Sequence, residues 1–263
     1  MNSKRIFAMV LRHLYVWPKS PERFMWTFGW PLFGLILWGL TISFLQNNSS
    51  SSFSFVTFII GGIIFWEMVV QPQREISINF IEEMWNKNFL NIFSSPLTNG
   101  EYLTALVIIG IFKMLATIVT LTVGAILLYQ FNIFSTFGFF IPILFINLLL
   151  FGMVLGFVVN ALILRFGWSI QEMAWAIVAI IQPLSCVLYP LASLPSWTQR
   201  ISLMLPSTYV FEEMRRVMSS GVVDIKNIMI SFLMNVVYLF LSLVFFKIMF
   251  EQARIHGRLV KLS

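Results

Sequence analysis

Charged residues are scarce in this sequence: Asp, Glu, Lys and Arg together make up 11% of its 263 residues. A soluble domain carries roughly 25%, so most of the surface must face something other than water. Hydrophobic residues reach 59%, and the mean hydropathy is +0.87. Lipid is the solvent that this composition favours, and we expect an integral membrane protein.

Residues that carry metal and redox chemistry are almost absent. The sequence has one cysteine, Cys186, and two histidines, His13 and His256, near opposite ends of the chain. They permit no intrachain disulfide and form no zinc constellation. Burial in the membrane explains Cys186 better than redox chemistry does.

The motifs of common enzymes are missing as well. The sequence has no Gly-rich loop ending in Gly-Lys-Ser/Thr that would hold ATP phosphates. It also lacks His-Glu-x-x-His, Gly-x-Ser-x-Gly and any paired Asp motif. We therefore expect that this chain binds no cofactor and is not an enzyme.

Six hydrophobic segments are long enough to cross a bilayer, which takes about 20 apolar residues. They are Trp26–Leu45, Phe53–Val70, Leu106–Tyr129, Phe137–Leu164, Met173–Leu191 and Ile228–Phe250. Because their apolar runs do not alternate as barrel strands would, each predicts a helix. The expected fold is an all-α polytopic membrane protein with six transmembrane helices in a single domain, residues 1–263. It divides into an N-terminal region (1–25), a membrane region (26–250) and a tail (251–263).

The net charge of +6 is gathered at the two ends of the chain. The basic residues there are Lys4, Arg5, Arg12, Lys19 and Arg23 before the first span, and Arg254, Arg258 and Lys261 after the last. The short loops at 46–52 and 130–136 contain none. By the positive-inside rule, both termini lie in the cytoplasm of a cell whose inner membrane the chain spans. We expect contact with membrane lipid and none with nucleic acid.

The N-terminal segment Ser3–Trp17 predicts a helix lying on the membrane. Lys4, Arg5 and Arg12 fall on one stripe at about 100° per residue, and Trp17 lies elsewhere around the axis. A basic stripe on an apolar helix suits an anionic membrane surface. Two roles remain open for this helix, a topological anchor or a mechanical part.

Residues 71–99 form the one sizeable cytoplasmic loop that the six spans leave. Within it, Ile78–Ile92 predicts a short amphipathic helix with charge on one side and aromatic residues on the other. Its charged residues are Glu82, Glu83 and Lys87, and its aromatic residues include Trp85 and Phe89. Thr98 and Glu101 then match a capping box at the start of the third span.

Prolines interrupt the segment between the fifth and sixth spans. Pro190, Pro195 and Pro206 separate apolar runs that are too short to cross, and Trp197 is expected near a membrane interface. This pattern predicts a re-entrant or broken hairpin in the outer leaflet, whose irregular backbone must be buried in protein or line a cavity.

Polar residues inside the spans are functional candidates by default. Glu67 and Lys113 both fall toward the cytoplasmic leaflet, where they either have a structural role, by pairing with each other or by extending to the membrane surface, or belong to a polar path. Asn160 is expected to make an interhelical hydrogen bond. Gly152 and Gly156 form a Gly-x-x-x-Gly motif that permits close approach of another helix.

Three regions of the sequence together resemble the type-2 ATP-binding-cassette (ABC) export permeases. The first is RHLYVWPKSPERFMWTFGWPLFGLILWG, a basic amphipathic helix running into a first span with Trp and Pro. The second is FSSPLTNGEYLTALVIIGIFK, an entry into the third span through Ser-Pro-Leu. The third is QPLSCVLYPLASLPSWTQRISLMLPSTYVFEEMRRVM, in which prolines punctuate a hairpin and an Arg follows the last of them.

This resemblance implies a permease homodimer driven by two copies of a cytoplasmic ABC ATPase, which bind ATP and Mg²⁺ on a separate chain. Glu82, Glu83, Trp85, Lys87 and Phe89 would belong to a coupling helix that docks on the ATPase. The helix from Lys4 to Trp17 would share that surface, and the hairpin from Pro190 to Tyr209 would close the outer end of the path. The first span lacks the Tyr-Arg…Leu-Gly…Trp pattern of O-antigen polysaccharide permeases. A drug, a lipid or a lipid-linked oligosaccharide is therefore favoured as the substrate.

Two other classes of function stay open from the residues alone. An ion-coupled secondary transporter would use Glu67, although no acidic residue lies at the middle of a span and no internal repeat is visible. A membrane enzyme acting on lipid would need clustered acids, and Glu212 with Glu213 is the one pair that remotely fits. Adjacent residues on a helix point about 100° apart, which makes this pair a poor acid–base couple.

Overall fold

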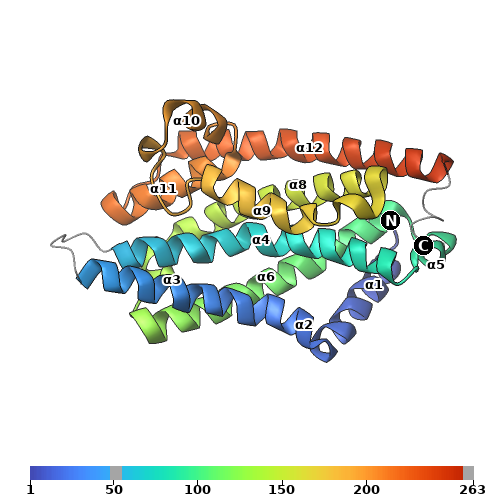
Figure 1. Cartoon of the computed structure of the whole chain (residues 1–263), viewed down its shortest axis with the longest axis horizontal. Coiled ribbons are helices and arrows are strands. Elements are labelled where there is room, and N and C mark those ends of the chain that lie inside the picture. Colours follow the sequence, from blue (N-terminus) through green and yellow to red (C-terminus); the bar gives the residue numbers. More distant parts are fainter. Residues whose placement is uncertain (48–54, 257–263) are drawn as a thin grey trace.

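The computed structural model describes residues 1–47 and 55–256, and these residues form an all-helical bundle without strands (Figure 1). The helices near the start are α1 (Ser3–Val16), α2 (Pro21–Phe24), α3 (Trp30–Asn47), α4 (Phe55–Trp85) and α5 (Phe89–Ser94). The middle of the chain forms α6 (Asn99–Tyr129), α7 (Ile133–Phe137), α8 (Ile141–Phe166) and α9 (Met173–Leu184). The last are α10 (Ser196–Ser202), α11 (Pro206–Ser220) and α12 (Ile225–Ile255). The loop expected at 46–52 lies partly outside the described residues, and Arg258 and Lys261 lie wholly outside them.

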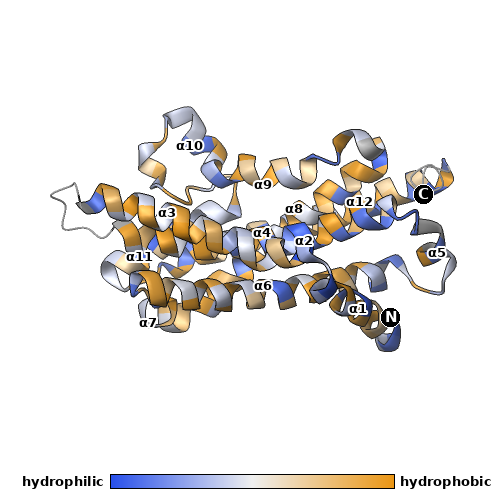
Figure 2. Ribbon diagram, turned by 60° about the horizontal axis from the view of Figure 1, so that its bottom comes forward, coloured by the Kyte–Doolittle hydropathy of each residue, from blue (hydrophilic) through white to orange (hydrophobic). Residues whose placement is uncertain are grey.

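Within the described residues, five helical segments are long and apolar enough to cross a membrane: 21–46, 56–85, 99–129, 133–166 and 225–255. The prediction of a polytopic membrane protein is confirmed at this level. Large apolar residues are exposed along α3 and α12, as expected for helices that face lipid. The ribbon of α3 is mostly in the hydrophobic colours (Figure 2). Polar caps mark several helix starts, including Asn2 before α1, Ser20 before α2 and Asp224 before α12.

The expected fifth span, Met173–Leu191, is not one continuous helix. The helix α9 ends at Leu184 after 12 residues, which covers about 18 Å at 1.5 Å per residue and falls short of the roughly 30 Å hydrocarbon core. Pro183 lies in its last turn and Pro190 follows six residues after its end, so the backbone cannot continue as a regular helix. The chain nevertheless returns across the bundle through α9 and the irregular segment after it (Figure 1).

The helix α4 forms the centre of the bundle, between α3, α6 and α8 (Figure 1). Of its membrane-crossing window, 83% is buried, against 22% for the windows of the first span and α12. Two apolar clusters pack along it, one with Phe65 and Met68 near its middle and one with Phe80 and Met84 near its C-terminal end. Any movement of α4 must therefore be transmitted to most of the other spans.

Different helices lie at the two ends of the bundle. At one end, α1 lies inclined to the other helices, near α5 and the last turns of α12 (Figure 1). We call this the α1 end. At the opposite end lie α7, α10 and α11, and we call it the α11 end. The start of the chain and the end of α12 share the α1 end, as the predicted placement of both termini on one side requires.

Candidate functional site

A buried carboxylate near the end of α4 fastens α1 to the bundle. Glu83 is 3% exposed, and Arg12 of α1 reaches it with both terminal nitrogens. The Nη1–Oε1 distance is 2.6 Å and the Nη2–Oε2 distance is 3.0 Å. Asn88 also donates to Oε2, at 2.7 Å. This two-pronged geometry is the strong form of an Arg–carboxylate pair, so Glu83 holds α1 in place rather than facing a partner protein.

Two further carboxylates join the N-terminal segment to the bundle. Glu82 pairs with Arg23, which lies in α2. Glu101 accepts a hydrogen bond from the backbone N–H of Asn2 at 2.6 Å and lies 3.7 Å from Arg5. The same Glu101 completes the predicted capping box with Thr98, which is confirmed. Contacts within the first 23 residues thus fix this segment to the end of α4 and the start of α6.

The basic stripe predicted on α1 divides its contacts between protein and surroundings. The helix itself is confirmed, from Ser3 to Val16, and Lys4 is exposed. Arg5 and Arg12 turn toward Glu101 and Glu83, with about 40% of each arginine side chain exposed. Trp17 follows the helix and donates its indole N–H to Thr27 Oγ1 at 3.2 Å. Contacts with protein carboxylates favour the mechanical role for this helix over a purely topological one.

The predicted separate helix at Ile78–Ile92 does not form. Residues up to Trp85 continue α4 without a break, and a new short helix, α5, starts at Phe89. Between them the chain turns at Lys87, whose φ of 53° is left-handed. Trp85 is 43% exposed and donates its indole N–H to Gln171 Oε1 at 3.1 Å. Of the predicted coupling residues, Trp85 and Lys87 are exposed at the tip of α4, whereas Glu82 and Glu83 pair with arginines. The side chain of Phe89 lies outside the described part of the structure.

The intramembrane charges pair differently from the sequence prediction. Lys113 is 2% exposed and its Nζ lies 2.7 Å from Glu75 Oε2, not beside Glu67. The ring of Trp17 lies 5.5 Å from the same nitrogen, within the range of a cation–π contact. Glu67 instead accepts a hydrogen bond from Gln71 Nε2 at 3.0 Å. The expected Glu67–Lys113 pair was wrong because the carboxylate two turns further along α4 is the one that faces α6.

Glu75 lies in the segment 71–99, which the sequence assigned to a loop after a second span that ended at Val70. A proline is unusual inside a helix, and one stands at position 72 of this segment. In the structure Pro72 lies inside α4, where a Cβ built on Gly110 of α6 would lie 3.4 Å from Pro72 Cα and 3.4 Å from Glu75 Cβ. Close packing against α6 keeps the helix together. The apolar residues Ile76, Phe80 and Met84 at helical spacing were the signal that α4 continues.

Polar and small residues of α8 bring it close to its neighbours, as predicted. Asn160 is fully buried and donates to the backbone oxygen of Ile76 in α4 at 2.9 Å. A Cβ added to Gly152 would lie 2.5 Å from the backbone oxygen of Val69, and one on Gly156 would lie 2.8 Å from Ile76 Cβ. The Gly-x-x-x-Gly motif therefore serves the α4–α8 contact.

A buried histidine lies beside these charges at the α1 end. His13 is 4% exposed. Burial, followed by the charge of Arg12, lowers the pKa of His13 to about 4. Glu75 and Glu83 act in the opposite direction, and Arg23 in the same one. His13 is therefore neutral at physiological pH and needs no counter-charge.

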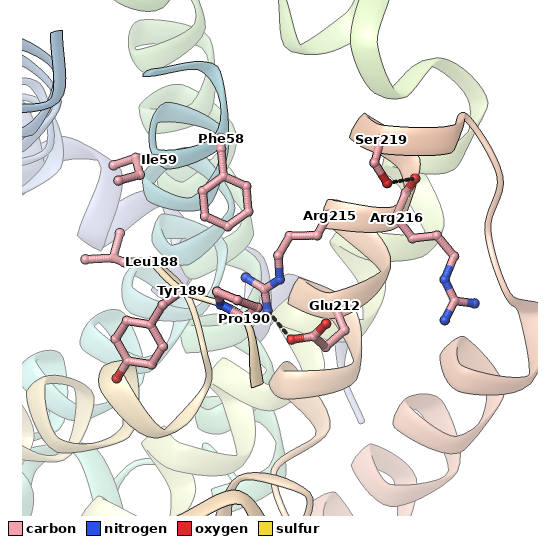
Figure 3. A pocket seen from close by; sticks show the side chains of 9 residues that line it. All are labelled: Phe58, Ile59, Leu188, Tyr189, Pro190, Glu212, Arg215, Arg216 and Ser219. Carbon is pink, nitrogen blue, oxygen red and sulfur yellow. Dashed lines mark hydrogen bonds and ion pairs between the residues drawn. The ribbon is translucent and has the colours of Figure 1, made fainter. Parts of the chain in front are cut away.

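The α11 end carries the irregular segment that the prolines predicted. Pro190 precedes a short 3₁₀ turn, Pro195 precedes α10, and Pro206 is the first residue of α11. Trp197 is 67% exposed, and Cys186 is fully buried as expected. Residues of the irregular segment, Leu188 to Pro190, line a cavity of about 580 Å³ (Figure 3).

Among the described residues, no group of three His, Cys, Asp or Glu side chains is placed to hold a metal ion. Glu212 and Glu213, considered as an acid pair, diverge: Glu212 accepts from Arg215, and Glu213 accepts from the backbone of Asp224 and from Asn227. No protein-family model matches the chain, and no curated protein shows significant sequence similarity to it.

Proposed function

We propose that this chain is the membrane subunit of an ATP-driven exporter of the type-2 ABC kind, present as a homodimer in the inner membrane with both termini in the cytoplasm. ATP and Mg²⁺ would bind to two copies of a separate ATPase. The substrate would be a hydrophobic or amphiphilic molecule, such as a drug, a lipid or a lipid-linked oligosaccharide. The proposal extends the resemblance of the three sequence regions described above.

The observation that carries the proposal is the continuity of α4. One helix of 31 residues runs from the α11 end through the buried centre of the bundle to an exposed tip at Trp85 and Lys87. Because α4 is packed on all sides, a push on that tip moves the centre of the bundle rather than a loose loop. A separate motor protein needs a rigid lever of this kind to act on a membrane path.

The ion pairs at the α1 end connect further helices to α4. Glu82 and Glu83 join the last turns of α4 to α2 and α1, so force on the tip also reaches the first span. In this mechanism ATP binding brings the ATPases together, and the displaced tip tilts the spans between inward-facing and outward-facing states. Trp85, Lys87 and the start of α5 at Phe89 would contact the ATPase, while Glu82 and Glu83 act as positioning residues behind them.

The test is a tip variant in which Trp85→Ala and Lys87→Ala are combined. Purified from its own cell with its associated proteins, the wild-type chain is expected to bring a cytoplasmic ATPase that contains a Gly-Lys-Ser/Thr loop. The double variant is expected to lose most of that ATPase, or to retain it with hydrolysis no longer stimulated in liposomes. Trp197→Ala is the matched control, since it removes an exposed tryptophan from the opposite end. Absence of any ATPase from the wild-type preparation would refute the proposal.

The buried charges favour one alternative, an ion-coupled secondary transporter. Glu75 and Lys113 are buried and Glu67 is partly buried, and ionisable residues inside the membrane commonly mark ion pathways. Such a transporter would work in liposomes without ATP, would stop when the proton or sodium gradient is collapsed, and would be inactivated by Glu67→Gln. An ATP-driven exporter would show none of these three properties.

A further inference from the structure

The cavity at the α11 end combines an apolar wall with a charged edge. The wall is formed by Phe58 and Ile59 of α4 and by Leu188 and Pro190 of the irregular segment. The charged edge comes from α11, and Figure 3 shows the Arg215 guanidinium turned toward the wall with Glu212 beside it. A volume of about 580 Å³ lies in the range typical of small-molecule sites, which are mostly apolar with a few polar groups that fix orientation.

The charged edge has unused hydrogen-bonding capacity. Glu212 Oε1 accepts from the backbone N–H of Leu191 at 2.7 Å and from Arg215 Nη2 at 2.6 Å. Oε2 of the same carboxylate accepts no hydrogen bond from the residues that the structure describes. Arg215 donates from Nη1 to the backbone oxygen of Cys186 at 2.7 Å. Of the five N–H donors of a guanidinium, two are thus engaged by described residues.

The balance of charge selects the kind of ligand. Arg216 also borders the cavity, but its guanidinium pairs with Glu213 and Asp224. The other two charged residues, Glu212 and Arg215, neutralise each other, so a purely anionic head would lie against the carboxylate and a purely cationic head against the guanidinium. Either would leave a charge uncompensated in a partly buried site, which is costly. A head that carries both charges can satisfy both residues. Because Glu212 accepts hydrogen bonds, the cationic part must also have N–H groups to donate.

We propose that this cavity binds a phospholipid with an ethanolamine head. The ammonium group binds Glu212 Oε2 and the phosphate lies beside Arg215. One hydrocarbon chain follows Phe58, Ile59 and Leu188 toward the middle of the bundle.

The position of the cavity agrees with this orientation. Phe58 is the fourth residue of α4, so the apolar wall begins within about 5 Å of the helix end at 1.5 Å per residue. The charged edge is on α11, among the polar residues at the end of the bundle. A phospholipid in the membrane also has its polar head at the surface and its hydrocarbon chain pointing inward, so its polar and apolar parts match the charged edge and the apolar wall. Lipid binding needs no ATP and no partner protein, so this inference does not depend on the proposed function.

The experiment compares lipids that differ only in the head. The full chain, purified in detergent, is incubated with an equal mixture of phosphatidylethanolamine, phosphatidylcholine and phosphatidylglycerol with identical chains. Native mass spectrometry then counts the lipids that the protein retains. The ethanolamine lipid is expected to be retained about tenfold over the choline lipid, the size of one charge-assisted hydrogen bond. Choline lacks N–H donors but keeps the positive charge and the phosphate.

Two variants connect the preference to the cavity. Glu212→Gln keeps an oxygen that accepts from Leu191 and Arg215 but replaces the free acceptor Oε2 by an NH2 donor. The ethanolamine N–H groups then have no acceptor there, so the preference for ethanolamine over choline should vanish. Ile59→Trp fills the apolar wall and should abolish retention of the ethanolamine lipid. Leu40→Trp is the matched control, since Leu40 lies on α3 with 61% exposure, away from the cavity, and should change nothing. Thermal unfolding in the same detergent verifies that each variant is folded.

Equal retention of the three lipids by the wild-type chain would overturn the proposal. Preferential retention of phosphatidylglycerol would also overturn it, because the site would then select a negative charge. A preference that persists in both Glu212→Gln and Ile59→Trp would place the lipid elsewhere on the protein.

Discussion

Replacing Glu75 by Gln is expected to lower the free energy of unfolding by about 3–5 kcal/mol, the usual cost of leaving one member of a buried ion pair alone. Lys113 is 2% exposed and Glu75 is 6% exposed, so neither charge can recruit much water when its partner is lost. Glu75 Oε2 accepts from both Lys113 Nζ at 2.7 Å and Asn79 Nδ2 at 2.8 Å. Gln keeps an oxygen that can accept from these donors, so the decrease in the free energy of unfolding measures the effect of removing the negative charge.

A double-mutant cycle separates this interaction from general damage to the core. Lys113→Met alone should also destabilise, because it leaves the carboxylate of Glu75 buried without its cation. The combined variant, Lys113→Met with Glu75→Gln, should be more stable than the sum of the two losses predicts, by roughly 1–3 kcal/mol of coupling energy. Glu67→Gln should cost far less than Glu75→Gln, since the partner of Glu67 is the neutral side chain of Gln71.

The assay is thermal unfolding of the purified chain in one detergent, followed by circular dichroism. For a chain of this size, each kcal/mol corresponds to roughly 2–4 °C in Tm, so the Glu75 variant should melt about 10 °C lower than the wild type. If the two single losses added without coupling, Glu75 and Lys113 would not interact as the structure indicates. A larger loss for Glu67→Gln than for Glu75→Gln would restore the pairing that the sequence suggested.

Two further perturbations test other contacts with the same assay. Gly152→Ala should destabilise the protein by about 2 kcal/mol, because the added Cβ would lie 2.5 Å from the backbone oxygen of Val69. The control Gly34→Ala, with nothing within 4 Å of the added Cβ, should be neutral or stabilise by up to about 1 kcal/mol. Equal losses at both sites would refute the close α4–α8 contact. For His13, the folded pKa of about 4 lies below the unfolded value of about 6.5, so the unfolded chain binds the extra proton and stability falls as pH drops from about 6.5 to 4. The total loss is about 3 kcal/mol, and His13→Gln should flatten the stability profile in that window.

The sequence predicted most of the membrane region because lipid imposes simple rules. Five predicted spans correspond to long helices, since an apolar run in lipid must satisfy its own backbone. Proline did not have the same effect at every position. The predicted second span ended at Val70, although α4 continues through Pro72 to Trp85, whereas Pro183 and Pro190 accompany a real break after α9. The three prolines differ in their surroundings, with Pro72 packed against α6 through Gly110, and such contacts are tertiary.

In the candidate site, too, the contacts between sequence neighbours were predicted and the contacts between distant helices were not. The capping box at Thr98 and Glu101 and the helix of α1 depend on neighbours in sequence, and both were found. The pairings of Glu82, Glu83 and Glu75 depend on how helices far apart in sequence pack together. A charge pattern identifies acidic residues near a membrane surface, but it does not say whether their partner is water, lipid or an arginine of another helix.

Among the described helices, α4 contributes residues both to the tip at the α1 end and to the cavity at the α11 end. At the α1 end its last turns carry Glu82, Glu83 and the exposed tip, and at the α11 end its first turns carry Phe58 and Ile59 of the cavity. Because the helix is continuous and closely packed by α8 at Gly152 and Gly156, displacement of the tip must either shift the cavity wall or bend the helix. Pro72 is the position where bending costs least, since it removes one backbone hydrogen bond. If Pro72→Ala stiffens α4, the tip variant (Trp85→Ala with Lys87→Ala) should change lipid retention at the cavity more when Pro72→Ala is also present than in the wild-type background. Native mass spectrometry of the wild type, the tip variant, Pro72→Ala and their combination measures this coupling.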